Sequence, residues 1–85
     1  MDTEKIKVEN GWVEITDGNE AQFTLQNVGS NSIILRYATT APTAGEDGLV
    51  LAPFEGVTST IHGIGATWAR SYSQNSPSKI VKVFN

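Results

Sequence analysis

Turn-forming residues divide this chain into short segments, and their spacing is the strongest constraint on its fold. Glycine, proline, asparagine and aspartate cluster at roughly ten-residue intervals and leave segments of strand length between them. No segment carries the 3.6-residue apolar period of an amphipathic helix. The pattern predicts an all-β fold: a small single-domain β-sandwich, a jelly-roll-like fold or a barrel of about seven or eight short antiparallel strands.

The best-defined predicted strands alternate between apolar and polar side chains. Residues 20–27 place Ala21, Phe23 and Leu25 on one face and polar residues on the other, which is typical of a half-buried strand. Residues 32–39 are rich in β-branched and aromatic residues, which favour strands. The remaining predicted strands cover residues 48–52, 56–63, 66–73 and 79–85. The last of these is ambiguous in its burial, because apolar residues occupy both of its faces.

The N-terminal segment is predicted to form a β-hairpin over about residues 4–16. Asn10 and Gly11 both tolerate the positive φ of a type I′ turn, and this dipeptide is the strongest short-range hairpin signal. Counting outward from the turn places Val8 opposite Val13, with the apolar pairs on one face and a Lys–Glu pair on the other.

Composition excludes several classes of function. The 85 residues make one domain, residues 1–85, with 39% hydrophobic residues and a net charge of −3. Lysine and arginine do not cluster, so the basic stripe that binds nucleic acid is absent from the sequence. No apolar run approaches the roughly 20 residues of a membrane span, and the acidic, mixed N-terminus is unlike a signal peptide. We expect neither a nucleic-acid partner nor a membrane partner.

The sequence offers no convincing catalytic or metal-binding set. His62 is the only histidine, and the absence of cysteine excludes thiolate catalysis and disulfides. The acidic turns at residues 17–20 and 46–48 lack the spacing of an EF-hand loop, and their residues suit turns for backbone reasons. The glycines at residues 63–65 lack the spacing of a phosphate-binding loop. We therefore predict a non-enzymatic protein with no catalytic residues, no metal and no cofactor.

The large aromatic residues allow two interpretations. Trp12, Trp68, Tyr37 and Tyr72 could form a platform on which a sugar stacks, or they could fill a thin core. Arg70 shares a strand face with Trp68, where a guanidinium either contacts an aromatic ring at an interface or is simply solvated. The residues that remain candidates for interface or glycan contact are Trp12, Arg36, Trp68 and Arg70.

The order of several short motifs resembles small β-proteins encoded among the structural genes of tailed bacteriophages. The resemblance spans roughly residues 12–83. Its motifs are a QN-x-G turn at residues 26–29, an R-Y-A strand end at 36–38, a G-L-x-L-x-P segment at 48–53, W-A-R at 68–70 and a valine-rich strand at 80–83. Two features depart from the pattern: the N-terminal hairpin is not part of it, and Phe54 stands where a small residue usually follows the proline.

The resemblance implies a virion structural protein. Its first form is a capsid decoration (cement) protein on the capsid exterior, soluble in the host cytoplasm before assembly. Its partners would be the major capsid protein lattice and further copies of itself, in a homotrimer. The alternative is a receptor- or glycan-binding β-module of a tail or head fibre. In either form the N-terminal hairpin would be free to contact a neighbouring subunit.

The segment at residues 39–47 is the predicted binding loop. Its side chains are small, polar or acidic, so we do not expect them in the hydrophobic core. Binding residues tend to lie on exposed loops carried by a rigid β scaffold. An alternative is a plain surface loop. The predicted partner-binding residues are Thr39, Thr40, Pro42, Thr43, Glu46 and Asp47.

Overall fold

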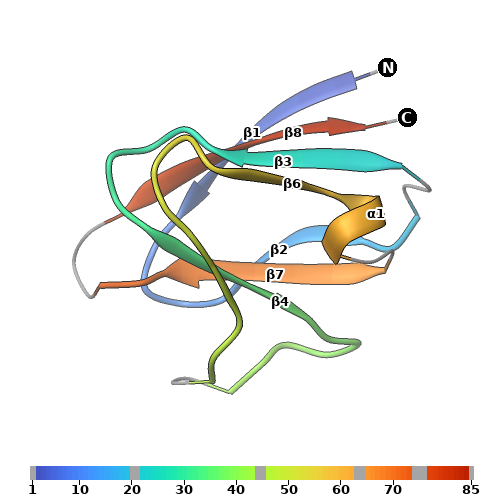
Figure 1. Cartoon of the computed structure of the whole chain (residues 1–85). Coiled ribbons are helices and arrows are strands. Elements are labelled where there is room, and N and C mark those ends of the chain that lie inside the picture. The colour runs from blue at the N-terminus through green and yellow to red at the C-terminus, as the bar shows by residue number, and fades with distance from the viewer. Residues whose placement is uncertain (1, 20–21, 44–45, 63–64, 74–76, 85) are drawn as a thin grey trace.

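Two antiparallel sheets pack face to face and confirm the all-β prediction (Figure 1). The computed structural model describes residues 2–19, 22–43, 46–62, 65–73 and 77–84. The first sheet has the order β1 (Asp2–Val8), β8 (Ser78–Phe84), β3 (Phe23–Asn27), β6 (Gly56–Thr58). The second sheet has the order β2 (Val13–Asp17), β7 (Ala66–Ser71), β4 (Ile33–Tyr37), β5 (Leu49–Leu51). Of the alternatives that the sequence left open, a small sandwich is the one observed.

The core lies between the sheets and is built by alternation along the strands. In β3, Phe23 and Leu25 are buried while Thr24 and Gln26 are exposed, as the period-2 pattern predicts. Ala21, which was assigned to the same face, lies outside the described residues. The apolar core residues come from all eight strands: Val8, Ile15, Phe23, Leu25, Ile33, Leu35, Leu51, Val57, Ala69 and Ile80.

The predicted N-terminal hairpin is wrong, because β1 and β2 belong to different sheets. β1 pairs with β8, with Val8 opposite Ser78, and β2 pairs with β7, with Val13 opposite Ala69. Asn10 is not among the described residues that have a positive φ, and neither is Gly11, so the backbone here is not a type I′ turn. Each strand instead buries its apolar face against the opposite sheet, and this tertiary packing outweighs the local turn preference.

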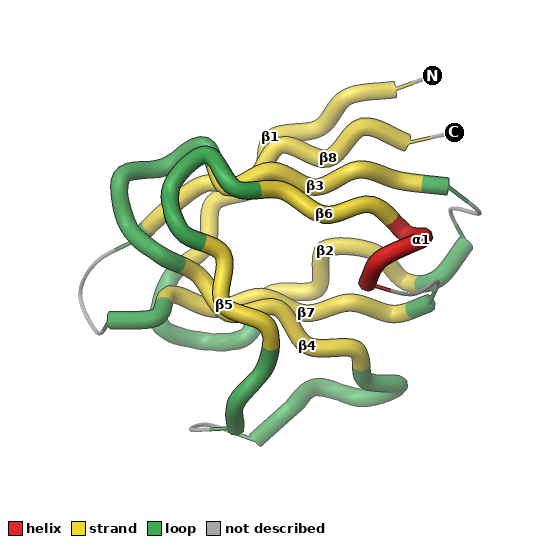
Figure 2. Tube along the Cα trace, viewed as in Figure 1, coloured by secondary structure: helices red, strands yellow, loops and turns green. Residues whose placement is uncertain are grey.

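The segment predicted as one strand over residues 56–63 is also partly wrong. Only Gly56–Thr58 form the strand β6, and the chain then turns into the one-turn helix α1 (Ser59–His62), which Figure 2 shows at the edge of the sandwich. The Ser59 hydroxyl is buried and accepts a hydrogen bond from the Phe23 backbone N–H at 3.4 Å. A four-residue helix is too short to leave a 3.6-residue period in the sequence.

The structure resolves the ambiguous burial of the last strand. In β8, Ser78, Ile80 and Lys82 point into the sandwich. Lys82 is only 4% exposed, and its ammonium donates a hydrogen bond to the Ile15 carbonyl at 2.8 Å. This contact bridges the two sheets through a charged residue in the core.

Candidate functional site

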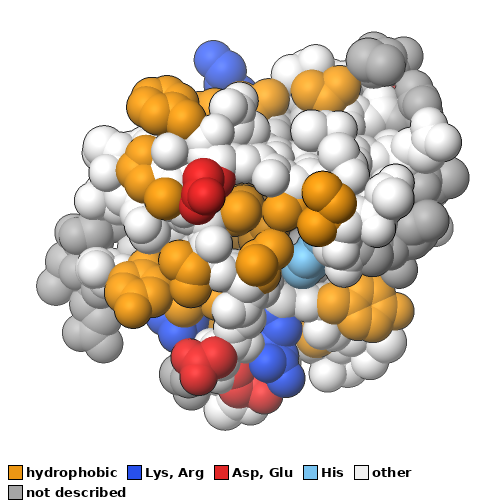
Figure 3. Space-filling model, viewed as in Figure 1, with side chains coloured by type: hydrophobic (Ala, Val, Ile, Leu, Met, Phe, Trp, Pro, Cys, Tyr) orange, Lys and Arg blue, Asp and Glu red, His pale blue; other side chains and the backbone are white. Residues whose placement is uncertain are grey.

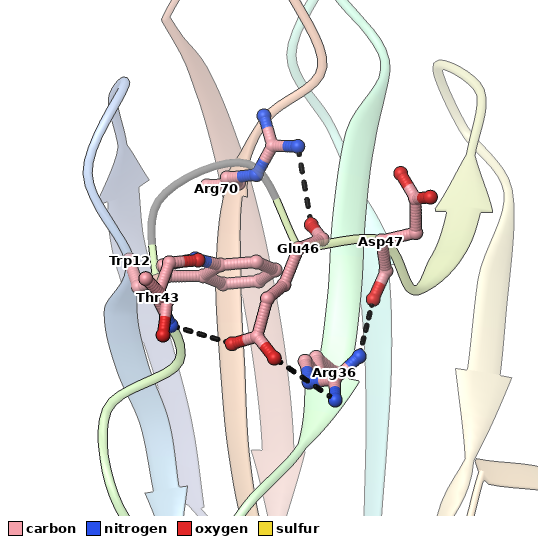
Figure 4. Close-up of polar contacts among 6 residues, drawn as sticks. All are labelled: Trp12, Arg36, Thr43, Glu46, Asp47 and Arg70. Atoms are coloured by element: carbon pink, nitrogen blue, oxygen red, sulfur yellow. Dashed lines mark hydrogen bonds and ion pairs between the residues drawn. The ribbon is translucent and has the colours of Figure 1, made fainter.

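The loop at residues 39–47 joins β4 to β5 and is held on the outer face of the second sheet by four side chains. The Trp12 indole N–H donates to the Thr43 carbonyl at 3.0 Å, and the Arg70 guanidinium donates to the Glu46 carbonyl at 3.2 Å (Figure 4). The Arg36 guanidinium donates to the Asp47 carbonyl at 2.7 Å (Figure 4). The Trp68 indole N–H donates to the carbonyl of Ala38, just before the loop, at 3.1 Å. We call these four residues the clamp: Trp12, Arg36, Trp68 and Arg70.

Strand register explains why the clamp residues lie together. On β7 the buried side chains are Thr67, Ala69 and Ser71, so Trp68 and Arg70 project from the outer face. Arg36 of β4 lies directly opposite Trp68 in the antiparallel pairing. Trp12 comes from the segment just before β2, the other neighbour of β7. Three adjacent parts of one sheet thus direct hydrogen-bond donors toward the same loop.

Glu46 closes the loop from within. Its carboxylate accepts a hydrogen bond from the Thr43 N–H and forms an ion pair with Arg36 at 3.3 Å (Figure 4). The Glu46 N–H donates in return to the Thr43 carbonyl at 3.2 Å. Both members of the ion pair are more than a third exposed, so the pair orients the loop and contributes little to the stability of the fold.

A cation–π contact completes the clamp. The Arg70 guanidinium carbon lies 5.3 Å from the centroid of the Trp12 ring. Both side chains are half-buried. The interface interpretation of Arg70 assumed a ring on its own strand, whereas the ring that it contacts belongs to Trp12, from another part of the chain.

The clamp fixes the inner side of the loop and leaves polar side chains on its outer side. Thr39, Thr40, Thr43 and Asp47 are exposed, whereas Pro42 and Glu46 are half-buried. The predicted loop residues and the predicted aromatic and arginine residues therefore belong to one assembly. Sequence reasoning selected both sets but did not connect them, because the connection depends on strand order.

The described residues bring together no metal-binding group. His62 lies on α1, away from the loop, where burial lowers the pKa of its imidazole, and its Nε2 has no hydrogen-bond partner among the described residues. No group of three His, Cys, Asp or Glu residues capable of holding a metal occurs in the described part of the chain. An open hollow of about 340 Å³ beside α1 is lined mainly by Thr, Ser and Phe side chains. None of the described helices has the length and apolar character needed to span a membrane.

The fold and the site together define a small all-β sandwich domain that carries a clamped, threonine-rich loop. Comparison of the chain with protein-family models, with curated proteins and with solved structures finds no match.

Proposed function

We propose that this chain is a non-enzymatic bacteriophage virion structural protein, of the capsid-decoration type, which binds the assembled head through the loop at residues 39–47. The resemblance of its motif order to small phage structural proteins supports the class of protein. The clamp supports the choice of the loop at residues 39–47 as the binding surface. The proposed partner is the major capsid protein lattice, and the proposed location is the capsid exterior.

The observation that carries this proposal is the anchoring of an exposed loop by four half-buried donors. A loop held in one conformation before binding loses less conformational entropy when it meets a partner. The exposed threonine side chains are small and carry hydroxyl groups that can donate or accept hydrogen bonds. Repetition of a modest contact across a lattice then provides strong overall attachment.

The positions of the aromatic residues give less support to the alternative, a glycan-binding module, than to the capsid-decoration proposal. Trp12 and Trp68 are half-buried, and both indole N–H groups already donate to backbone carbonyls, that of Thr43 in the loop and that of Ala38 just before it. Tyr37 and Tyr72 are exposed, but they lie at opposite ends of the β4–β7 pair. A sugar-stacking platform made of all four rings therefore lacks support.

Cosedimentation of the purified protein with phage heads tests the proposal. We expect the double variant Thr39→Arg/Thr40→Arg to bind heads at least tenfold more weakly, because two long charged side chains then cover the outer side of the loop. Thr24→Arg is the matched control, since Thr24 is an exposed strand threonine on the other sheet. Equal binding of the loop variant and wild type would exclude the loop as the head-binding surface, and failure of wild type to bind heads would exclude the decoration function.

A further inference from the structure

Phe54 adopts a backbone conformation that its side chain disfavours. It has φ of 69°, and it is the one non-glycine residue with positive φ in the described part of the chain. It lies in a turn in which the Glu55 N–H donates to the Ala52 carbonyl at 3.0 Å, with Pro53 before it. A proline followed by a residue of positive φ is the pattern of a type II turn, whose third position is normally glycine.

The surrounding hydrogen bonds hold Phe54 rigidly in this conformation. The Phe54 N–H donates to the Asn27 carbonyl at 2.6 Å, and the Gln26 side-chain amide donates to the Phe54 carbonyl at 3.0 Å. The Glu55 carboxylate accepts from the Ala52 N–H at 2.7 Å. None of these contacts uses the Phe54 side chain, so a glycine at position 54 would keep every one of them.

The ring of Phe54 adds nothing to the core, because the residue is 72% exposed. A strained backbone that displays an unpacked aromatic ring calls for a role outside the folding of the single chain. Large exposed aromatics on a rigid turn are typical anchors of protein–protein interfaces.

The strand just before this turn is an uncharged sheet edge. β5 is the last strand of its sheet, and it exposes Leu49 and Val50 by 44% and 46%. Figure 3 shows hydrophobic side chains gathered on the face of the molecule that β5 and α1 occupy. Exposed apolar edges of this kind pair readily with another strand.

The other edge strands are protected against such pairing. β1 carries both acidic and basic residues, and β2 carries Glu14 and Asp17 and has a register shift. β6 exposes no large apolar residue and leads directly into α1. Among the described edge strands, β5 alone combines exposed aliphatic side chains with the absence of charge.

Symmetry favours a second copy of the chain as the occupant of this edge. When two copies of one strand pair antiparallel about a two-fold axis, each residue lies opposite a residue whose side chain is on the same face of the sheet. Centred on Val50, this pairing sets Leu49 against Leu51 of the other copy, with no like charges in the strands. The same operation on β1 sets Glu4 against Glu4 or Lys5 against Lys5, which is repulsive.

We infer that the chain forms a two-fold dimer through β5, in which the strands of the second sheets pair edge to edge and the Phe54 ring of each copy packs against the other copy. The pairing ends at Leu51, and the turn that carries Phe54 begins directly after it. The dimer does not depend on head binding. It differs from the homotrimer that the phage resemblance implies.

Light scattering coupled to size-exclusion chromatography tests this inference, with the protein loaded at concentrations up to about 1 mM so that weak association is detected. We expect wild type to show twice the chain mass. Val50→Glu should show the single-chain mass, because it places two carboxylates opposite each other across the two-fold axis. Phe54→Gly should raise the dissociation constant of the dimer at least tenfold. Tyr72→Ser is the control for exposed apolar area, since Tyr72 is 56% exposed and follows β7, which β4 separates from β5.

Circular dichroism of each variant distinguishes a lost interface from a lost fold. Wild type that remains a single chain at every concentration overturns the inference, and so does a trimer mass. A Val50→Glu variant that retains the native spectrum and dimerises as tightly as wild type also overturns it. Since none of these measurements includes heads, their outcome is separate from that of the cosedimentation experiment.

Discussion

The Ser78 hydroxyl donates a hydrogen bond of 2.7 Å to the side-chain oxygen of Asn27, and both residues are buried. The same Asn27 oxygen accepts from the Gly29 N–H at 3.1 Å. The Asn27 amide donates to the carbonyls of Asn31 and Leu51 at 2.8 Å and 3.0 Å. One fully buried side chain therefore joins β3, the following turn, β5 and β8, and so links the two sheets.

Asn27→Ala is expected to destabilise the fold by about 3 kcal/mol, because it leaves several buried groups without these partners, at about 1 kcal/mol or more for each. Ser78→Ala removes one donor while Asn27 keeps its other three contacts, so a loss of about 1 kcal/mol is expected. Urea unfolding followed by tryptophan fluorescence gives both free energies. A loss for Asn27→Ala no larger than that for Ser78→Ala would contradict the assignment of Asn27 as the junction between the sheets.

Lys82 makes a second inter-sheet contact of a different kind. Its ammonium donates to the Ile15 carbonyl, lies 3.8 Å from the Glu4 carboxylate and lies 4.4 Å from the centroid of the Phe84 ring. Replacing a buried charge by an apolar side chain of similar length is often nearly neutral, so we expect Lys82→Met to remain within about 1 kcal/mol of wild type. Lys82→Ala also leaves a cavity and should lose about 2–3 kcal/mol in urea unfolding. Equal losses for the two variants would show that the charge, and not the filled volume, stabilises this position.

The sequence predicts the strands well because period-2 alternation is a local property. The buried and exposed faces of β3 follow directly from it, whereas in β7 the alternation left open which face is buried, and the small side chains of Thr67, Ala69 and Ser71 take that place. The structure also explains why the QN-x-G and G-L-x-L motifs contain glycine. A Cβ on Gly29 would lie 2.0 Å from the Ser78 hydroxyl oxygen, and a Cβ on Gly48 would lie 2.1 Å from the Leu35 carbonyl oxygen. These glycines mark places where two parts of the chain approach closely.

Strand order is the part that local signals could not supply. Asn10 and Gly11 predict a hairpin by their turn preference, yet the strands on either side pair with β8 and β7, which come from the C-terminal part of the chain. The clamp depends on the same long-range pairing. Arg36 and Trp68 are adjacent only because β4 pairs with β7 in one register. A residue list could name the clamp, but only the register could show that its members converge on one loop.

Glu46 should control the order of the loop without controlling the stability of the fold. Glu46→Ala removes the acceptor for the Thr43 N–H and the ion pair with Arg36, so we expect amide hydrogen exchange at Thr43 to accelerate by about tenfold or more. The free energy of unfolding should change by less than about 1 kcal/mol, because the pair is partly exposed. Glu46→Gln keeps an oxygen acceptor and should give an intermediate exchange rate. Unchanged exchange in Glu46→Ala would mean that this carboxylate does not close the loop.

Because His62 is partly buried, we expect the free energy of unfolding to fall in mild acid. Burial lowers the pKa of its imidazole below the usual value of about 6.5, so the unfolded chain binds the proton more readily than the folded chain. The contribution of His62 is fully present above the unfolded pKa and is lost as pH falls through the lower, folded pKa. The urea midpoint of wild type should therefore fall between pH 7 and mildly acidic pH, and His62→Gln should reduce that fall. An NMR titration that places the folded pKa at or above the value in a short unfolded peptide would contradict the prediction.

Phe54→Gly should stabilise the single chain, which is unusual for the removal of a large aromatic residue. A side chain in the left-handed region costs about 1–2 kcal/mol, whereas the extra freedom of glycine in the unfolded state costs about 0.5–1 kcal/mol, so a net gain of up to about 1.5 kcal/mol is expected. Gly18→Ala is the opposite control: Gly18 has φ of 96°, and a Cβ there would lie 3.2 Å from the Gly65 Cα, so this variant should lose stability. Urea unfolding in the Val50→Glu background keeps dimerisation out of the comparison. A clear loss of stability in Phe54→Gly would show that the ring serves the fold of its own chain, and the argument that it is displayed for a partner would then fail.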